Sequence, residues 1–257
     1  MKISHNTSPT LYCLSTGPGD PELMTLKAVR IAGECPVIAL SVDKTRRDRE
    51  HFTEADDGRL RENCVAYQIA SQAVPGMEKK EFLYLSMPMS KDRALLERSH
   101  EEAAEAVIGQ LKQGKSVAWL TLGDATVYAT SAYVAALVEA EGFLVEFISG
   151  VPSFCAAAAR LGRPLVSGSE QLHVLPSSYH IEDALSLPGT KVLMKAGSRM
   201  GQVKGILKEK RLEAQGVQRC GMDGEIIYPD TDSLDENAGY YTVIIVNGSS
   251  IDFSGGE

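Results

Sequence analysis

The sequence predicts an α/β fold made of two α/β domains, and three observations lead to this prediction. In the first part of the chain, an apolar run, a glycine-containing loop and a helix-compatible stretch follow one another three times. Such runs are typical of strands buried on both faces of a parallel sheet. Residues 161–169 (LGRPLVSGS) then have the composition of a linker. A chain of 257 residues is long enough for one large or two modest domains. With this linker, we predict an N-terminal domain over residues 1–165 and a C-terminal domain over residues 166–257.

The N-terminal domain is expected to begin with a strand, a glycine loop and a helix. Asp20 is a suitable helix N-cap and Pro21 suits the first helical position, so the first helix is expected over residues 21–34. Ser90 is similarly placed to cap a long helix over residues 91–113. The expected strands are residues 10–16, 36–40, 82–86, 116–122 and 143–148, with one further strand within 61–70, and the other expected helices are 126–141 and 154–161.

The C-terminal domain has shorter apolar runs, separated by polar segments that contain glycine. Such alternation of short strands and helices is typical of a second α/β unit. The strand over residues 191–194 is followed by Lys195, Ala196 and Gly197, which form a further loop of small residues after an apolar run. The expected strands are residues 172–175, 191–194, 217–220 and 241–246, and the expected helices are 181–187 and 199–213.

The composition argues against several classes of function. A formal net charge of −8 disfavours a general nucleic-acid-binding surface and binding to anionic membranes. No apolar run approaches the ~20 residues of a membrane span, and the N-terminus lacks the apolar core of a signal peptide, so we expect a cytoplasmic protein. The five cysteines form no C-x-x-C pair and the five histidines are scattered. We therefore expect neither a disulfide framework nor a protein metal site.

The central segment of the first domain is residues 120–128 (LTLGDATVY). Gly123 and Asp124 follow a predicted buried strand, and open α/β sheets bind ligands at the carboxyl ends of their strands. Because Gly123 has no Cβ, a flat ligand can lie against the backbone there, and Asp124 can accept hydrogen bonds from ligand hydroxyls or amines. The alternative is a tight turn in which Asp124 only caps the next helix.

Residues 17–22 (GPGDPE) allow a dinucleotide site to be considered, because such domains begin with a glycine loop between strand and helix. Glu22 stands where the third glycine of that motif belongs, and Asp20 and Glu22 place carboxylates where a pyrophosphate would have to sit. NAD and FAD are therefore disfavoured, whereas a positively charged ligand would be tolerated. A third loop, residues 149–153 (SGVPS), again puts glycine after an apolar run, and Ser153 either meets a ligand or caps a helix.

Four segments together resemble the tetrapyrrole (corrin and sirohaem pathway) methylases. They are GPGDPEL near the start, GDATVY in the middle, SGVPSF soon after it, and KVLMKAG in the second half. Within that family, PMSKDR, AARLGRPL and GMDGE also resemble the branch of precorrin-2 or cobalt-factor II C20-methyltransferases. Three departures stand out: Ala125 replaces the proline that usually follows Gly-Asp, residues 149–152 (SGVP) stand where PGVT is common, and Ser15-Thr16 precede GPGD where Val-Gly is expected.

The resemblance implies two α/β domains with a ligand cleft between them, a bound S-adenosylmethionine, a trough for the tetrapyrrole, and a homodimer. It also implies that the enzyme chiefly aligns the methyl group with the carbon that receives it, so no strong base is required. Asp124 and Tyr128 are the predicted catalytic residues; for Tyr128 the alternative is core packing. The positions that match the donor-binding residues are Pro18, Leu122, Gly123, Asp124, Val127, Pro152, Ser153, Lys195 and Cys220.

A substrate that carries many carboxylates needs a local basic lining in a protein of net negative charge. The predicted substrate-binding residues are Asp20, Lys27, Arg30, Arg93 and Arg163, with Arg46, Arg47 and Arg49 on a flap as a further option. His100 and His173 are guesses for an axial contact with cobalt in the substrate. Three alternatives stay open: a methylase that acts at another ring position, a homologue that binds ligands without turnover, and, least favoured, a nicotinamide oxidoreductase.

Overall fold

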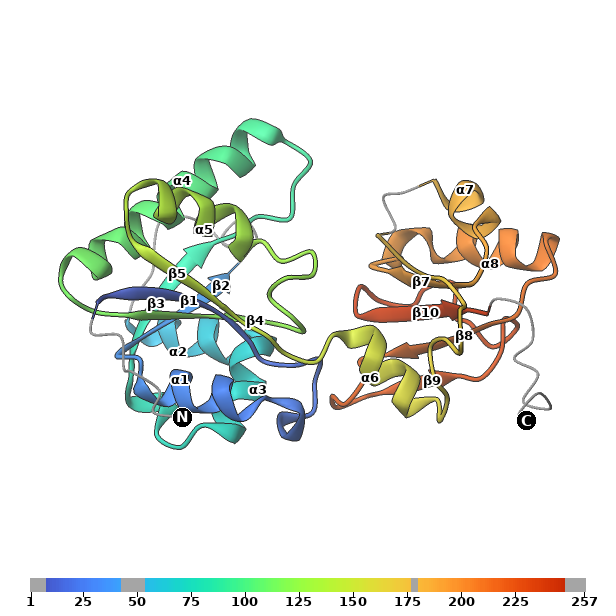
Figure 1. The fold of residues 1–257 in the computed structure, drawn as a ribbon, viewed down its shortest axis with the longest axis horizontal. Helices are drawn as coiled ribbons and strands as arrows, with labels where there is room; N and C mark the ends of the chain where they lie inside the picture. Colours follow the sequence, from blue (N-terminus) through green and yellow to red (C-terminus); the bar gives the residue numbers. More distant parts are fainter. Residues whose placement is uncertain (1–7, 43–53, 177–179, 248–257) are drawn as a thin grey trace. The chain divides into compact units, whose positions relative to one another are not determined.

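The computed structural model describes residues 8–42, 54–176 and 180–247, which form two compact units, residues 1–152 and 153–257. Each unit has its own sheet and its own helices (Figure 1). The break falls between Pro152 and Ser153, before helix α6 (Ser153–Arg160), whereas the boundary expected from composition follows that helix. Helix α6 belongs to the second unit because it packs against two strands of the second sheet, β8 and β10.

The first sheet is parallel throughout and has the strand order β3-β2-β4-β1-β5. All five carboxyl ends therefore lie at one edge, as the continuous apolar runs predicted. The predicted strands of this unit are confirmed to within two residues at either end, apart from the one within 61–70. Their bounds are β1 Thr10–Ser15, β2 Val37–Val42, β3 Glu81–Ser86, β4 Val117–Thr121 and β5 Leu144–Ile148.

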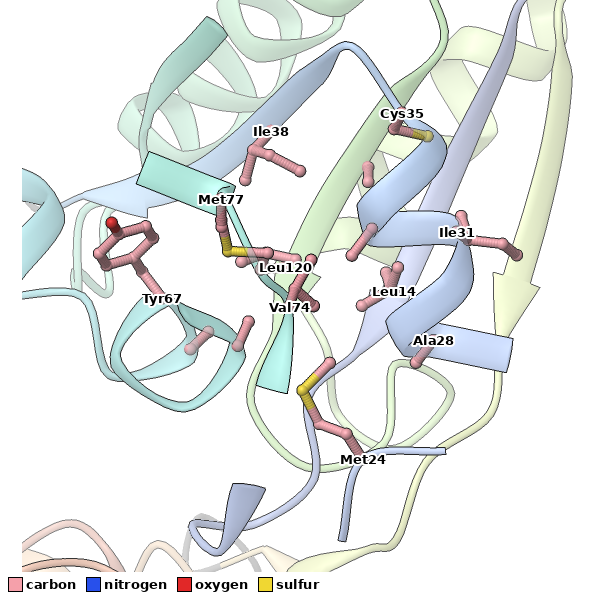
Figure 2. Close-up of a cluster of buried hydrophobic side chains, with 14 of the residues drawn as sticks. Leu14, Met24, Ala28, Ile31, Cys35, Ile38, Tyr67, Val74, Met77 and Leu120 are labelled. Atoms are coloured by element: carbon pink, nitrogen blue, oxygen red, sulfur yellow. The ribbon is translucent and has the colours of Figure 1, made fainter. Parts of the chain in front are cut away.

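Helices cover both faces of this sheet (Figure 1). On one face, Leu14 and Leu120 of the strands share a buried cluster with Ile31 of α1 and Tyr67 of α3 (Figure 2). On the other face, α4 and α5 bury a second cluster that includes Trp119. The helices are α1 Leu26–Glu34, α2 Glu54–Glu62, α3 Val65–Ala73, α4 Arg93–Lys112 and α5 Ser131–Ala140, with short 3-10 turns η1 Pro21–Leu23 and η3 Met77–Lys79.

Several expectations for the first unit are wrong. The strand expected within 61–70 is helical, because Ala66, Tyr67, Ile69 and Ala70 form a buried stripe at helical spacing. Asp20 caps only the turn η1, and the caps of the two long helices come later than expected. Thr25 caps α1 and Asp92 caps α4, each by accepting hydrogen bonds from backbone amides of the first turn.

The second sheet is mixed, with the strand order β6-β7-β10-β8-β9. Strands β6 and β7 are parallel, whereas β10 runs antiparallel to both β7 and β8. One face buries a cluster with α7 and α8. The bounds are β6 Leu172–Pro176, β7 Thr190–Met194, β8 Ala214–Gln218, β9 Ile226–Tyr228 and β10 Thr242–Val246, with α7 Ile181–Ser186, the 3-10 turn η4 Gly197–Arg199 and α8 Met200–Glu209.

Two elements of the second unit differ from the sequence-based expectation. The strand expected at 217–220 is β8, which begins at Ala214 and ends at Gln218, because the next residue, Arg219, adopts a left-handed backbone with φ of +54°. The helix expected at 199–213 ends at Glu209, and Arg211 follows it with φ of +52°. Strand β9 was not predicted, since it contributes only three residues.

Candidate functional site

The candidate site lies at the carboxyl edge of the first sheet, where the loops after β1 and β4 are bonded to each other. Gly17 and Gly123 exchange two backbone hydrogen bonds, with N···O distances of 2.8 and 3.2 Å. Both residues are left-handed, with φ of +74° and +76°, which glycine adopts without a steric penalty. A Cβ added at Gly17 would lie 3.1 Å from the carbonyl oxygen of Leu23, but a Cβ at Gly123 would meet no protein atom within 4 Å. The backbone of Gly123 therefore borders open space.

The carboxylate of Asp124 is buried and accepts three hydrogen bonds from neighbouring residues. One oxygen accepts hydrogen bonds from the amide (2.7 Å) and the hydroxyl of Thr126, and the other accepts from the amide of Gly150 at 2.8 Å. Burial by itself would raise the pKa of Asp124, but these hydrogen bonds outweigh it and hold the pKa below its ordinary value. Asp124 is not a helix N-cap, since α5 begins only at Ser131. The tight turn of the alternative is present, since the amide of Val127 donates to the carbonyl oxygen of Asp124, but its helix-capping role is wrong. A proton-accepting role for Asp124 is disfavoured.

A second buried polar group, the hydroxyl of Ser15, connects three segments. It donates to the carbonyl oxygen of Ile148 at 2.5 Å and accepts from the amide of Ala125 at 2.8 Å. Gly150 lies against it, because a Cβ at this glycine would be 2.4 Å from Ser15 Cβ and 2.9 Å from the carbonyl oxygen of Gly123. The ends of β1 and β5 and the loop after β4 are thus locked together by side chains and glycine contacts.

The predicted catalytic Tyr128 lies in the loop that leads to α5, with φ of +50°, and not on a helix as expected. Its side chain is 47% exposed, so the core-packing alternative is wrong. Of the other predicted donor-binding residues in this unit, Pro18 is buried, whereas Leu122, Val127 and Pro152 are partly buried. All four lie in the loops that follow β1, β4 and β5.

In the second unit, Lys195 follows β7 and Cys220 follows β8. Lys195 has a left-handed backbone with φ of +59°, and its ammonium lies 5.8 Å from the ring centroid of Tyr240. Cys220 is buried next to the left-handed Arg219, whose amide donates to the carbonyl oxygen of Tyr241 at 2.9 Å. Ser153 begins helix α6 in the same unit. Non-glycine residues at positive φ are concentrated at functional sites in proteins, which supports a role for these loops.

The predicted substrate-binding cations differ in how they are held. Lys27 forms an ion pair with Glu146, and Arg30 pairs with Glu34 at 2.7 Å, so both charges are partly neutralised at the surface. Arg163 donates to the amide oxygen of Gln215 at 2.9 Å, and Arg93 is exposed in the first turn of α4. Asp20 accepts a hydrogen bond from the amide of Glu22 at 2.9 Å, which leaves its second carboxylate oxygen for other partners. The flap residues Arg46, Arg47 and Arg49 lie outside the described residues.

The two histidines that were guessed to contact cobalt have other surroundings. His100 of α4 stacks on Tyr133 of α5, with ring centroids 5.1 Å apart and planes 4° from parallel. His173 lies on β6, and its Nε2 is buried without a hydrogen-bond partner. Among the residues that the structure describes, no group of three or more His, Cys, Asp or Glu side chains is arranged to hold a metal ion. None of the helices in the described ranges is long and apolar enough to cross a membrane.

The sequence analysis missed the residues that shape the site without matching a ligand-binding position. Thr126 and Gly150 hold Asp124, and Ser15 was noted only as a departure from a motif. Tyr240 was not singled out, and Tyr241, whose ring makes an edge-to-face pair with that of Tyr240 at 5.4 Å, was taken only as part of a strand. The left-handed backbone of Arg219 leaves no signal in the sequence, because arginine is not a residue that favours this conformation.

Comparison with known proteins gives one consistent result. A profile of the tetrapyrrole (corrin/porphyrin) methylases matches residues 10–234. A probable cobalt-precorrin-2 C(20)-methyltransferase of Methanocaldococcus jannaschii is 34% identical over 72% of this chain and 71% of its own length. A cobalt-precorrin-2 C(20)-methyltransferase of Salmonella typhimurium is 30% identical over 92% of this chain and 95% of its own length. A precorrin-2 C(20)-methyltransferase of a Sinorhizobium species is 28% identical over 93% and 95%.

Solved structures agree on the fold. A cobalt precorrin-4 methyltransferase superposes with a TM-score of 0.68 at 19% identity and covers 95% of this chain and 96% of its own. Uroporphyrin-III C-methyl transferase from Thermus thermophilus, in a complex with S-adenosyl homocysteine, gives a TM-score of 0.63 at 20% identity, with 93% and 97% covered. The resemblance seen in the loop motifs is confirmed over most of the chain, and the protein belongs to the tetrapyrrole (corrin/porphyrin) methylase family.

Proposed function

We propose that this protein transfers a methyl group from S-adenosylmethionine to C20 of precorrin-2 or cobalt-factor II, a step of cobalamin biosynthesis. The observation that carries this proposal is that relatives matched along more than nine tenths of the chain carry the names cobalt-precorrin-2 and precorrin-2 C(20)-methyltransferase. Because these names differ in whether cobalt is present, both forms of the macrocycle are proposed substrates.

The residues of the carboxyl edge fit the methyl donor. Open space borders the left-handed backbone of Gly123, next to the Gly17–Gly123 bridge. We assign donor binding to Pro18, Leu122, Gly123, Asp124, Val127, Pro152 and Ser153, with Lys195 and Cys220 from the second unit. The acidic first loop, with Asp20 and Glu22, suits a positive charge better than a phosphate.

The bound donor supplies a methyl group on a sulfonium, which the electron-rich C20 carbon accepts in an in-line displacement. The protein's task is to orient the two partners and to exclude water. Asp124 is too firmly hydrogen-bonded, and too acidic, to serve as a general base. We propose instead that it shapes the donor loop, and that the exposed side chain of Tyr128 contacts one of the ligands.

Recognition of the substrate's carboxylates requires cationic side chains that do not already form ion pairs with carboxylates of the protein. Arginine grips carboxylates with two parallel hydrogen bonds, so we assign Arg93 and Arg163 to this role ahead of Lys27 and Arg30, whose charges are already paired. Arg163→Ala or Arg93→Ala should weaken tetrapyrrole binding and leave the affinity for S-adenosylhomocysteine unchanged.

The decisive experiment incubates the protein with S-adenosylmethionine and either reduced dihydrosirohydrochlorin or its cobalt complex. Mass spectrometry should detect one added methyl group, and carbon NMR with a labelled donor should locate it at C20. A label at another ring carbon would keep the family and overturn the C20 assignment. No transfer to either substrate, with S-adenosylhomocysteine bound, would favour a homologue without turnover.

We also propose, from the family resemblance, that the protein is a cytoplasmic homodimer. Light scattering should give twice the 27.7 kDa mass of one chain at micromolar concentration. A mass of a single chain under those conditions would contradict the dimer.

A further inference from the structure

We propose that Ser15 is a positioning residue of the donor site: its buried hydroxyl holds the loop of residues 122–130 in the shape that the donor requires. This inference rests on the proposed function, since it assigns a role to Ser15 in donor binding. Ser15 is the last residue of β1 and has 0% exposure, so it acts through its neighbours and not by touching the ligand.

The hydrogen bonds of Ser15 leave its hydroxyl in one defined orientation. A hydroxyl has one proton, and Ser15 gives it to the carbonyl oxygen of Ile148, the last residue of β5. The same oxygen accepts from the amide of Ala125, in the loop after β4. One small side chain therefore satisfies two backbone groups from two other strand ends, in a place where water does not reach them.

Asp124 completes the connection from the other side. Its carboxylate accepts from the amide of Gly150, two residues beyond Ile148. The chain from Ser15 through Ala125, Asp124 and Gly150 to Ile148 is thus a closed ring of hydrogen bonds and covalent links. Gly150 is required for this ring, because a side chain there would collide with Ser15 Cβ. Gly123, whose backbone borders the open space, directly precedes Asp124, and its carbonyl oxygen lies beside Gly150.

The pairing of Ser15 with Ala125 explains one departure of this sequence from the motif that it resembles. Proline, which usually follows Gly-Asp there, has no N–H and would leave the acceptor of Ser15 unused. With alanine, a buried N–H is present and must be satisfied. The hydroxyl at position 15 and the amide at position 125 therefore act as a pair: a buried amide at 125 needs the hydroxyl as its acceptor, and a proline at 125 does not.

Three variants of the full-length chain test this pair by calorimetric titration with S-adenosylhomocysteine. Ser15→Ala should weaken binding about tenfold, equivalent to ~1.4 kcal/mol, because the orphaned amide of Ala125 draws the loop away. Ala125→Pro alone should also weaken binding, because the proline ring would put a carbon where the amide proton now meets the Ser15 hydroxyl, only 2.8 Å from the nitrogen. The double variant, Ser15→Ala with Ala125→Pro, should recover most of the lost affinity, since it has no orphaned amide.

The matched control is Thr10→Val at the opposite end of β1, which removes another buried hydroxyl far from the loops. It should lower the melting temperature without changing the affinity. Wild-type affinity in Ser15→Ala, or equal weakening in the single and double Ser15 variants, would overturn the proposal. Faster hydrogen exchange of the amides of residues 122–130 in Ser15→Ala, but not in Thr10→Val, supports it without any ligand; equal exchange contradicts it. A wild-type protein that binds no S-adenosylhomocysteine would instead overturn the proposed function.

Discussion

The carboxyl edge of the first sheet and the corresponding edge of the second are built in different ways. In the first, all strands are parallel, and three strand ends are tied together by glycine contacts and by the buried side chains of Ser15 and Asp124. In the second, β10 runs the other way, so Tyr241 reaches the edge beside the ends of β7 and β8. Those ends turn through left-handed Lys195 and Arg219, which carry long side chains.

The two edges should therefore differ in how well they tolerate amino-acid substitutions. The first edge depends on close packing and on buried polar groups. An added methyl group cannot be accommodated there, and the removal of an acceptor leaves a buried donor without a hydrogen bond. The second edge depends on left-handed backbone conformations of Lys195 and Arg219, which cost energy. We therefore expect substitutions at the first edge to have large effects on stability and binding together, and substitutions at the second edge to separate the two.

Gly150→Ala should have the largest effect. The new Cβ would overlap Ser15 Cβ at 2.4 Å and the Gly123 carbonyl oxygen at 2.9 Å, and neither atom is at the flexible end of a side chain. Overpacking of this kind costs about 1–3 kcal/mol. Thermal unfolding should shift down by several degrees, and S-adenosylhomocysteine should no longer raise the melting temperature. A variant with wild-type melting and binding would show that the first edge is not rigid.

Asp124→Asn should have the next largest effect, and its size should depend on pH. The carboxylate has a lowered pKa in the folded protein, so its stabilising contribution is complete above the unfolded-state pKa of about 3.9 and is lost as pH falls through the folded value. The variant should be about 1–3 kcal/mol less stable than wild type at neutral pH, because an amide nitrogen faces the Gly150 donor.

Denaturant unfolding at a series of pH values measures this dependence. The difference in unfolding free energy between wild type and Asp124→Asn should shrink as the pH drops below 4. A difference that stays constant from neutral to acidic pH would mean that the charge of Asp124 does not stabilise the edge.

Gly123→Ala should have a smaller effect on stability than Gly150→Ala, although the two glycines are neighbours in the site. A Cβ at Gly123 meets no protein atom within 4 Å, so only the left-handed backbone is penalised, by about 1–2 kcal/mol. Binding of S-adenosylhomocysteine should fall more than tenfold, because the methyl group occupies the space proposed for the donor. Normal binding by a folded Gly123→Ala protein would contradict the placement of the donor.

The contrast between the parallel first sheet and the mixed second sheet also explains how much of the fold could be predicted from the sequence. The parallel strands of the first sheet were predicted closely, since burial on both faces leaves long apolar runs such as residues 116–122. The mixed sheet was predicted less well: Ile226 and Ile227 of β9 are exposed at the sheet edge and form no run, and β8 was shifted. The helix at Val65–Ala73 was taken for a strand because its apolar stripe is short.

The candidate site shows a second limit of sequence-based prediction. Gly123, Asp124 and the small-residue loops could be recognised, because glycine and aspartate after an apolar run carry a local meaning. The bond from Ser15 to Ile148 joins positions 133 residues apart, and no local pattern reports such a contact. For the same reason, the role of Asp124 as a partner of Gly150 could be found only in the folded chain.

Lys195→Gly should have the smallest effect on stability and separates folding from binding at the second edge. Glycine removes the cost of the left-handed backbone but adds entropy to the unfolded chain, so the net gain in stability should be below ~1 kcal/mol. Arg211→Gly is the matched control, since Arg211 is also left-handed but lies between α8 and the start of β8, at the opposite end of β8 from Arg219. Both variants should melt at or slightly above the wild-type temperature.

Only Lys195→Gly should weaken binding of S-adenosylhomocysteine, several-fold, because it removes the ammonium that lies over the ring of Tyr240. Equal affinities in the two variants would remove Lys195 from the donor site, and a large loss of stability in Lys195→Gly would show that the second edge is as rigid as the first.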